Sequence, residues 1–169
     1  MSKECYLIRG LPGTGKTTIS KILSEILNIE ILSTDKIRRS ISFNGNLYSK
    51  ENKEQVYRKL EELLLESLNE RNPKILDGTF SKVTQVERIY NLCKTQKYGL
   101  KIIECFCSEE TIKKRLITRT DSLSDADYDV YEKIKEEYEV IGRNFQVYPL
   151  NTEQSFSKLK AILKEIIND

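Results

Sequence analysis

Residues 10–17, Gly-Leu-Pro-Gly-Thr-Gly-Lys-Thr, decide the fold, because they have the spacing G-x-x-x-x-G-K-[ST]. The apolar run Cys5-Tyr6-Leu7-Ile8 comes just before this stretch and suits a buried parallel strand. Apolar residues follow it at helical spacing, namely Ile19, Ile22, Leu23, Ile26 and Leu27. A strand, a glycine-rich loop and a helix in this order are the context in which the pattern binds phosphate.

The physical basis of this expectation lies in the loop backbone. Its glycines allow positive φ and bring N–H groups within reach of phosphate oxygens, and the helix that follows adds its positive dipole end. Lys16 is expected to reach the β- and γ-phosphates, and the Thr17 hydroxyl to bind Mg²⁺. The sequence therefore predicts a site for a nucleoside triphosphate at Gly10, Leu11, Pro12, Gly13, Thr14, Gly15, Lys16, Thr17 and Thr18.

Length and composition limit the alternatives. The 169 residues fit one α/β domain spanning residues 1–169. The chain has no apolar run near the ~20 residues of a membrane span, and residues 1–4 lack the apolar part of a secretory signal. We expect a cytoplasmic protein with no membrane partner, whose four cysteines are buried thiols. The absence of histidine and of a second cysteine pair argues against a zinc site, and no protein partner is inferred.

Strand-like and helix-like segments alternate along the chain, which predicts an α/β fold with a parallel sheet between two layers of helices. The predicted strands are 6–9, 30–33, 74–77, 100–107 and 145–150, and the predicted helices are 16–27, 50–69, 82–95, 109–119, 126–141 and 153–167. Residues 118–129 are polar and acidic and join two helices. They form either a solvated loop in which Ser124 or Asp125 caps the next helix, or a mobile lid, which we favour.

Ligands of a parallel sheet collect beyond the carboxyl ends of its strands, where Asp35 follows the second strand. Asp35, or equally Thr34, is a candidate N-cap of a short helix. Its alternative role is to orient or deprotonate an acceptor hydroxyl, and in a chain without histidine a carboxylate is the leading candidate for a general base. Arg38, one turn further on, is either a solvated charge or a site for an anionic acceptor.

Two arginines lie beside the candidate lid. Arg115 and Arg119 are spaced i, i+4 and share one helix face. Phosphoryl transfer needs cationic groups around the charge that spreads in its transition state. We expect both arginines to contact the nucleotide, with Arg119 as the catalytic one, whereas Arg115 has the alternative of pairing with a neighbouring acid.

Asp77 ends the third predicted strand and resembles a Walker B aspartate, which binds Mg²⁺ directly or through water. The next residue is Gly78 rather than the glutamate with which motor ATPases polarise water. The chain also lacks the Asn-Lys-x-Asp sequence of small GTPases. Both absences favour transfer to a bound acceptor.

Four stretches together carry a family resemblance: Gly-Leu-Pro-Gly-Thr-Gly-Lys-Thr-Thr at 10–18, Ser-Thr-Asp-Lys-Ile-Arg at 33–38, Leu-Asp-Gly-Thr-Phe at 76–80, and residues 103–119 with the following Ser-Asp-Ala-Asp at 124–127. The chain resembles the small P-loop kinases grouped with the kinase domain of 5′-hydroxyl polynucleotide kinases, and more distantly the zeta-toxin and gluconate-kinase-like P-loop kinases. The resemblance covers nearly the whole chain.

The resemblance implies a three-layer P-loop NTPase fold with strand order 2-3-1-4-5 and a helical lid at about 118–129. It implies ATP and Mg²⁺ as cofactors. In that family the aspartate matching Asp35 activates the acceptor hydroxyl, the arginine matching Arg38 holds the acceptor-side phosphate, and the arginine matching Arg119 acts on the donor phosphates from the lid. Acceptors across the family include nucleic-acid ends, sugars, nucleotide sugars and antibiotics.

Two functions remain open. The first is an ATP- and Mg²⁺-dependent kinase that phosphorylates a hydroxyl of a small molecule, a nucleotide or a 5′-OH nucleic-acid end. The net charge of only +2 argues against a broad nucleic-acid surface but does not exclude a protein that grips one strand end. The alternative is a nucleotide-binding regulatory or partner-binding ATPase with incidental hydrolysis.

Overall fold

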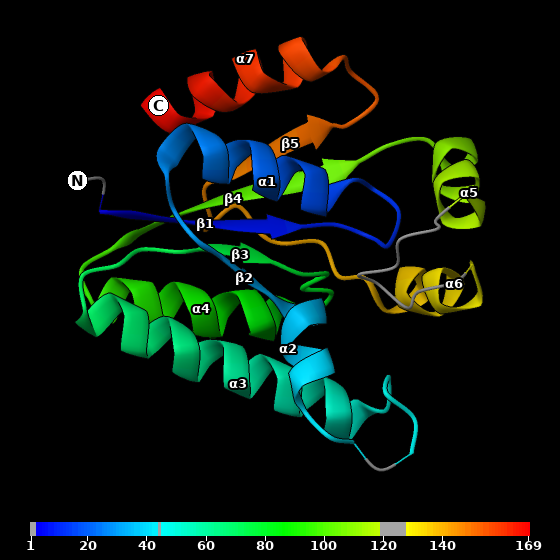
Figure 1. Ribbon diagram of the computed structural model, residues 1–169, viewed down its shortest axis with the longest axis horizontal. Helices are drawn as coiled ribbons and strands as arrows, with labels where there is room; N and C mark the ends of the chain where they lie inside the picture. The colour runs from blue at the N-terminus through cyan, green and yellow to red at the C-terminus, as the bar shows by residue number, and fades with distance from the viewer. Residues whose placement is uncertain (1–2, 44, 119–127) are drawn as a thin grey trace.

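The computed structural model describes residues 3–43, 45–118 and 128–169. Its centre is a five-stranded, all-parallel sheet with the order β2-β3-β1-β4-β5 (Figure 1). The strands are β1 (Glu4–Arg9), β2 (Ile31–Ser33), β3 (Ile75–Asp77), β4 (Gly99–Phe106) and β5 (Val147–Asn151). The fold class and the strand order expected from the sequence are thereby confirmed.

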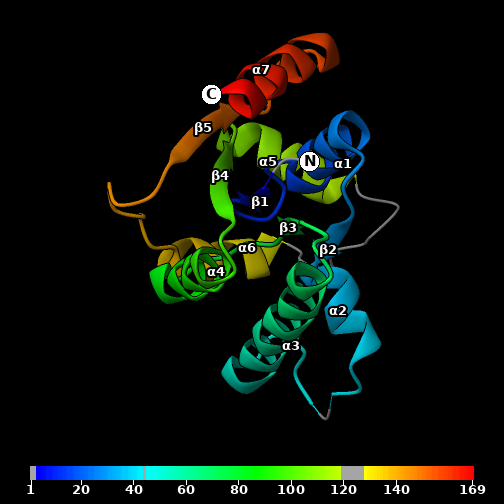
Figure 2. The same ribbon diagram turned by 90° about the vertical axis from the view of Figure 1, so that its left-hand side faces the viewer.

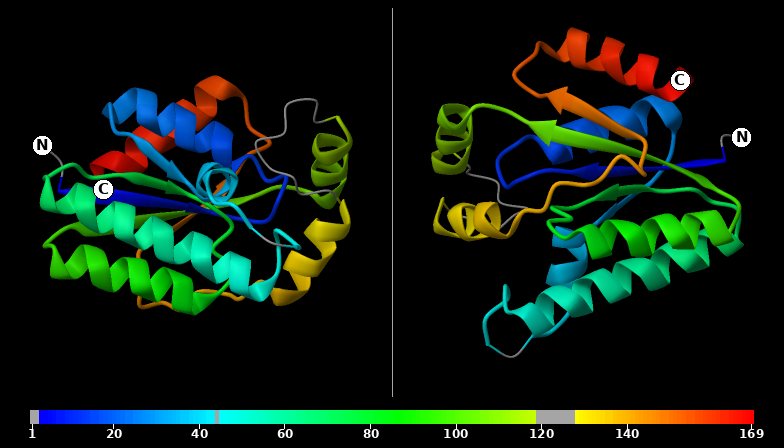
Figure 3. Two further views of the ribbon diagram at one scale, coloured as in Figure 1. Left: turned by 60° about the horizontal axis from the view of Figure 1, so that its bottom comes forward. Right: turned by 180° about the vertical axis from the view of Figure 1, so that it is seen from behind.

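Helices cover both faces of the sheet and its carboxyl edge. They are α1 (Lys16–Leu27), α2 (Thr34–Ser40), α3 (Lys50–Asn69), α4 (Val83–Thr95), α5 (Glu109–Ile117), α6 (Tyr128–Glu137) and α7 (Phe156–Asn168). Helices α1 and α7 pack on one face, and α3 and α4 on the other (Figures 1 and 2). Helices α5 and α6 lie beyond the carboxyl ends of the strands (Figure 3), where ligands of such sheets bind.

Burial on both faces explains why the strands read as continuous apolar runs. Successive side chains of a strand point to opposite faces, and β1 divides accordingly. Cys5 and Leu7 pack in the cluster that contains buried residues of α3 and α4. Tyr6 and Ile8 pack in the cluster of α1 and α7. The central strand thus holds two cores together and fixes the loop that follows it.

Several predicted element ends were wrong, and serine caps set two of the observed ones. Ser33 caps α2, since its side chain accepts a hydrogen bond from the N–H of Lys36 at 3.5 Å, so neither Thr34 nor Asp35 is the cap. Helix α7 begins at Phe156 rather than at 153, because Ser155 caps it. Helix α6 ends at Glu137 rather than at 141, and β5 begins at Val147 rather than at 145.

Most of the predicted lid, residues 119–127, lies outside the described residues, together with Arg119 and the candidate caps Ser124 and Asp125. All four cysteines are free thiols, and only Cys107 is not fully buried. Burial raises the pKa of the Cys105 thiol to about 12, which suits an inert core residue. Among the described residues, the helices are all too short or too polar to cross a membrane.

Candidate active site

The loop between β1 and α1 has the backbone that the glycines were expected to permit. Gly10, Gly13 and Gly15 all have positive φ, at 154°, 82° and 88°. A Cβ at position 10 would stand 2.5 Å from the carbonyl oxygen of Cys105, so the loop passes too close to β4 for any other residue. An internal hydrogen bond stabilises the loop: the Thr14 hydroxyl donates to the Leu11 carbonyl at 2.7 Å.

Lys16 and Thr17 begin α1 and point toward the carboxyl end of β3. The Lys16 ammonium donates to the Leu11 carbonyl at 3.0 Å and therefore arches over the loop. The Thr17 hydroxyl donates to Oδ2 of Asp77 at 3.1 Å, and Asp77 is only 5% exposed. A hydroxyl and a buried carboxylate side by side are oxygen donors of the kind that Mg²⁺ takes, with waters and phosphate oxygens completing its shell. These two residues fit the metal expected there.

Asp35 and Arg38 form an ion pair on α2, next to the phosphate loop. The distance between Oδ1 of Asp35 and Nη1 of Arg38 is 2.6 Å. Arg38 is 9% exposed and its Cζ lies 4.9 Å from the ring centroid of Tyr48, a cation–π contact. The other carboxylate oxygen of Asp35 has no hydrogen-bond partner among residues 3–43, 45–118 and 128–169. It is therefore open to a ligand.

The turn after β3 brings a third element to this place. Gly78 is required there, because a Cβ would stand 2.7 Å from the side chain of Thr34 at the start of α2. Phe80 follows with φ at +44°, an uncommon conformation for a bulky residue. Its ring is fully buried, 5.3 Å from the ring of Tyr57 on α3. Close packing between this turn, α2 and α3 thus forms one wall of the site.

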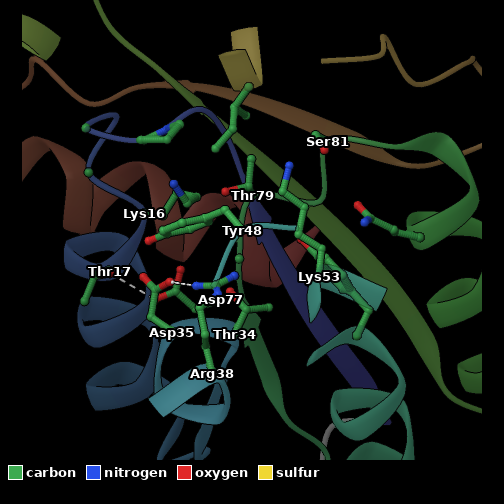
Figure 4. Close-up of a pocket in the computed structure, with 17 residues that line it drawn as sticks. Lys16, Thr17, Thr34, Asp35, Arg38, Tyr48, Lys53, Asp77, Thr79 and Ser81 are labelled. Carbon is green, nitrogen blue, oxygen red and sulfur yellow. Dashed lines mark hydrogen bonds and ion pairs between the residues drawn. The ribbon is translucent and has the colours of Figure 1, made fainter. Parts of the chain in front are cut away.

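One pocket joins these parts (Figure 4). Thr17, Asp35 and Asp77 lie together on one side of it, and Lys53 stands on the other. The pocket is lined by Pro12, Gly13, Gly15, Lys16, Thr17, Thr34, Asp35, Arg38, Tyr48, Lys53, Tyr57, Asp77, Gly78, Thr79, Ser81, Gln85 and Ile134. It therefore unites the phosphate loop, the two predicted metal-binding residues and the Asp35–Arg38 pair. The sequence did not predict the contributions of Tyr48, Lys53 and Tyr57.

A neighbouring pocket contains Thr18 and Arg115, together with Gly13, Gly15, Thr118 and Thr152. The Arg115 guanidinium donates to the Gly13 carbonyl at 3.3 Å, and to the Thr152 hydroxyl and carbonyl at 3.1 and 3.2 Å. Thr152 in turn donates to the Thr14 carbonyl at 2.6 Å. Arg115 thus contacts one carbonyl of the loop and two oxygens of Thr152 rather than the neighbouring acid considered from the sequence.

Arg9, which the sequence reasoning did not single out, lies under the phosphate loop. Arg9, the last residue of β1, is fully buried. Its guanidinium pairs with Glu104 at 3.3 Å, lies 4.3 Å from the ring centroid of Tyr138, and donates to the Glu139 carbonyl at 2.9 Å. Burial raises the pKa of the Tyr138 hydroxyl, which donates to Glu104 at 3.0 Å. This network fastens the segment after α6 to the base of the phosphate loop.

Curated relatives of the chain fall into two groups. An uncharacterized protein of Mycobacterium tuberculosis is 25% identical over 131 residues, which are 71% of this chain but 26% of that protein. The chain therefore spans about a quarter of the length of the first relatives it matches. Adenylate kinase of Mycoplasmopsis pulmonis is 30% identical over 76% of this chain and 64% of its own. Shikimate kinase of Bacillus cereus is 28% identical over 98% of this chain and 99% of its own.

Solved structures share the fold at lower identity. A sugar kinase from Janibacter sp. superposes with a TM-score of 0.76 at 16% identity, covering 99% of this chain and 95% of that one. Kti12 of Chaetomium thermophilum, solved with ADP-AlF3, gives 0.75 at 16% identity and 97% coverage of both chains. A family model described as an AAA domain, AAA_33, matches residues 6–141. The chain belongs to this AAA domain family and has the kinase-like P-loop NTPase fold.

Proposed function

We propose that the protein is an ATP- and Mg²⁺-dependent kinase that transfers the γ-phosphate to a hydroxyl of a bound acceptor. The observation that carries this proposal is the shared pocket, in which the phosphate loop and the Asp35–Arg38 pair face the same space. A site that only hydrolysed a nucleotide would not need a carboxylate and a guanidinium built into the space beside the γ-phosphate position. The kinase relatives and the shared fold support the same reaction class.

The donor half of the reaction falls to the loop residues. Loop N–H groups and Lys16 bind the β- and γ-phosphates. Thr17 and Asp77 hold Mg²⁺, which when bound neutralises charge on the phosphate oxygens. Arg119 is proposed to act on the donor phosphates from the segment after α5. Thr18 and Arg115 lie on the side of the loop away from Asp35, in the second pocket.

Asp35 acts on the acceptor in this proposal. The acceptor oxygen attacks the γ-phosphorus, the bond to the β–γ bridging oxygen breaks, and ADP leaves. The proton of the attacking hydroxyl passes to the carboxylate oxygen of Asp35 that Arg38 does not occupy. The 2.6 Å ion pair fixes the orientation of the carboxylate before the acceptor arrives, which is the benefit of a preorganised base.

The acceptor half of the pocket suits a hydroxyl compound that carries an anionic group. Arg38 and Lys53 bring two cationic side chains, and the Tyr48 ring offers an apolar face. Lys53 is shared with Glu137 at 3.6 Å, so Arg38 is the more deeply placed charge. We include small molecules, nucleotides and 5′-OH nucleic-acid ends among the acceptors. A relationship to 5′-hydroxyl polynucleotide kinases and a cytoplasmic location belong to this proposal.

An acceptor screen with Asp35→Asn tests the proposal. Purified protein with MgATP is offered hydroxyl compounds with and without an anionic group, and ADP and phosphorylated product are measured together. We expect Asp35→Asn to keep its affinity for ATP and to lose product formation by about 10²-fold or more. Glu87→Gln, the same change at an exposed position on α4, should have no effect. Nucleotide-dependent capture of a protein partner without any acceptor-stimulated ADP release would instead support the regulatory alternative.

A further inference from the structure

Tyr57 places a buried phenol at the acceptor half of the pocket. It lies on α3, is 6% exposed, and lines the same cavity as Asp35 and Arg38. Its ring belongs to the core that α3 and α4 form with the sheet. The ring alone would satisfy that packing role, as a phenylalanine would. The hydroxyl is therefore the part of the side chain that needs a separate explanation.

The backbone N–H of Phe80 donates to the Tyr57 oxygen at 3.0 Å, which fixes the hydroxyl in position. Phe80 presents its N–H with φ at +44°, a conformation that is strained in a residue with a Cβ. Strain of this kind persists only where the surrounding structure holds it, and it gathers at functional sites. The strained turn after β3 and the Tyr57 hydroxyl are therefore held against each other.

The hydrogen of that hydroxyl is still available. A phenol has one donor and two acceptor positions, and the Phe80 N–H uses only an acceptor position. Within residues 3–43, 45–118 and 128–169, no acceptor for the Tyr57 proton lies at hydrogen-bond distance. Burial raises the pKa of Tyr57 to about 12, so the group keeps its proton near neutral pH and remains a donor.

Arg38, which lines the same pocket, also has a hydrogen-bond donor without an acceptor in the described part of the chain. Its Nη1 binds Asp35, but its Nε is buried and has no hydrogen-bond partner among the residues that the structure describes. A buried donor left without an acceptor is unfavourable, and native proteins contain few such groups. Tyr57 and Arg38 line one pocket, and the Arg38 side chain is 10% exposed. A ligand that brings oxygen acceptors would accept the proton of the Tyr57 hydroxyl and offset the charge of Arg38, whereas a ligand that brings only donors would do neither.

We propose that the Tyr57 hydroxyl and Arg38 together bind an oxyanion of the acceptor, which makes Tyr57 a specificity-determining residue. The inference rests on the proposed kinase function and adds to it a residue that selects the acceptor. The group recognised is a carboxylate or a phosphate, because each has several oxygens. One oxygen can accept from Tyr57 on α3 while another pairs with Arg38 on α2. Neutral polyols lack the charge that Arg38 requires and bind more weakly.

Sulfate and acetate serve as probes, with the phosphate loop already filled. Protein saturated with Mg²⁺ and the ATP analogue AMPPNP is titrated with each anion at constant ionic strength, and binding is followed by calorimetry. We expect one saturable anion site in the wild type and about tenfold weaker binding in Tyr57→Phe, the loss typical of one charge-assisted hydrogen bond. Tyr90→Phe is the matched control, because its ring packs against Phe145 outside the pocket.

Tyr57→Phe leaves the Phe80 N–H without its acceptor and can fail to fold. A second measurement on the wild type therefore tests the inference without this variant. A crystal of the wild-type AMPPNP complex soaked in sulfate should show a sulfate oxygen within about 3 Å of the Tyr57 hydroxyl. Sulfate bound only elsewhere, no anion binding by the wild type, or equal affinities in wild type and Tyr57→Phe would each overturn the inference.

The anion-site proposal and the kinase proposal can fail independently, because anion binding is measured without turnover. If no acceptor stimulates ADP formation while sulfate binds at Tyr57, the proposed function fails and the anion subsite stands. If an acceptor is phosphorylated, Tyr57→Phe should raise its KM by about tenfold and change kcat much less, since the contact is formed on binding. An unchanged KM for an anionic acceptor would reject the role of Tyr57 and leave the kinase proposal intact.

Discussion

Replacement of Arg115 by alanine should loosen the phosphate loop and destabilise the protein. The guanidinium joins the Gly13 carbonyl on the loop to the hydroxyl and carbonyl of Thr152, which follows β5. These two segments are distant in the sequence, and Arg115 joins them in addition to the direct bond from the Thr152 hydroxyl to the Thr14 carbonyl. Arg115→Lys should recover little, because an ammonium cannot present the planar fork that reaches all three oxygens.

The magnitude follows from the three contacts, at 3.1, 3.2 and 3.3 Å. Hydrogen bonds to a charged donor are each worth about 1.5–3 kcal/mol, and we take about 1 kcal/mol each because Arg115 is half-exposed and the longest contact is weak. Thr152 keeps its own bond to the Thr14 carbonyl at 2.6 Å. The expected loss is therefore about 2–3 kcal/mol, or roughly 5–10 °C in Tm for a chain of this size.

Thermal and urea unfolding measure this loss, and calorimetric titration measures the affinity for AMPPNP. We expect that affinity to fall only about fivefold, because the loop residues that bind phosphate remain in the variant. Lys114→Ala is the matched control on the same helix, since Lys114 pairs with Glu110 and their side chains are 73% and 78% exposed. If Arg115→Ala is as stable as this control but loses nucleotide affinity more than a hundredfold, Arg115 contacts the nucleotide directly and the structural argument is refuted.

Three further predictions concern the donor site and the support of the fold. Lys16→Ala should lower phosphoryl transfer by about 10²–10³-fold while Tm stays near that of the wild type, and undiminished turnover would remove Lys16 from the site. Arg119→Ala, outside the described residues, should lower turnover by about 10²-fold with a smaller effect on ATP affinity, as measured by kcat and by AMPPNP titration. The Val83 N–H, and to a smaller extent the Lys82 ammonium, donate to the Glu139 carboxylate and lower its pKa. Glu139 therefore stabilises the fold above the ordinary pKa of 4.5, and this stabilisation is lost as the pH falls through the lowered pKa. Glu139→Gln should therefore flatten the acid limb of Tm against pH, whereas Glu132→Gln should leave its shape unchanged.

The sequence determined the parts of the site that are written in consecutive residues. The stretch from Gly10 to Thr17 specifies a strand–loop–helix unit, because glycine spacing and helical periodicity act over a few residues. The same local periodicity gave the α/β class. Asp35 and Asp77 were found for a related reason: each follows an apolar strand directly, and parallel strands end at one edge of the sheet. The strand order came from resemblance, since periodicity does not say which strands are neighbours.

Only the tertiary structure decided which distant residues share the pocket. Tyr57 meets the Phe80 N–H across 23 positions, and Arg115 meets Thr152 across 37. Such contacts depend on how far two elements stand apart and on the angle at which they pack, and no short-range pattern encodes either quantity. No pattern in the sequence therefore singled out Tyr57. The positive φ of Phe80 and the contact of Arg38 with Tyr48 depend on elements that are distant in the sequence and pack together. This packing brings the Tyr57 hydroxyl and Arg38 to one pocket, which is the basis of the proposed anion site.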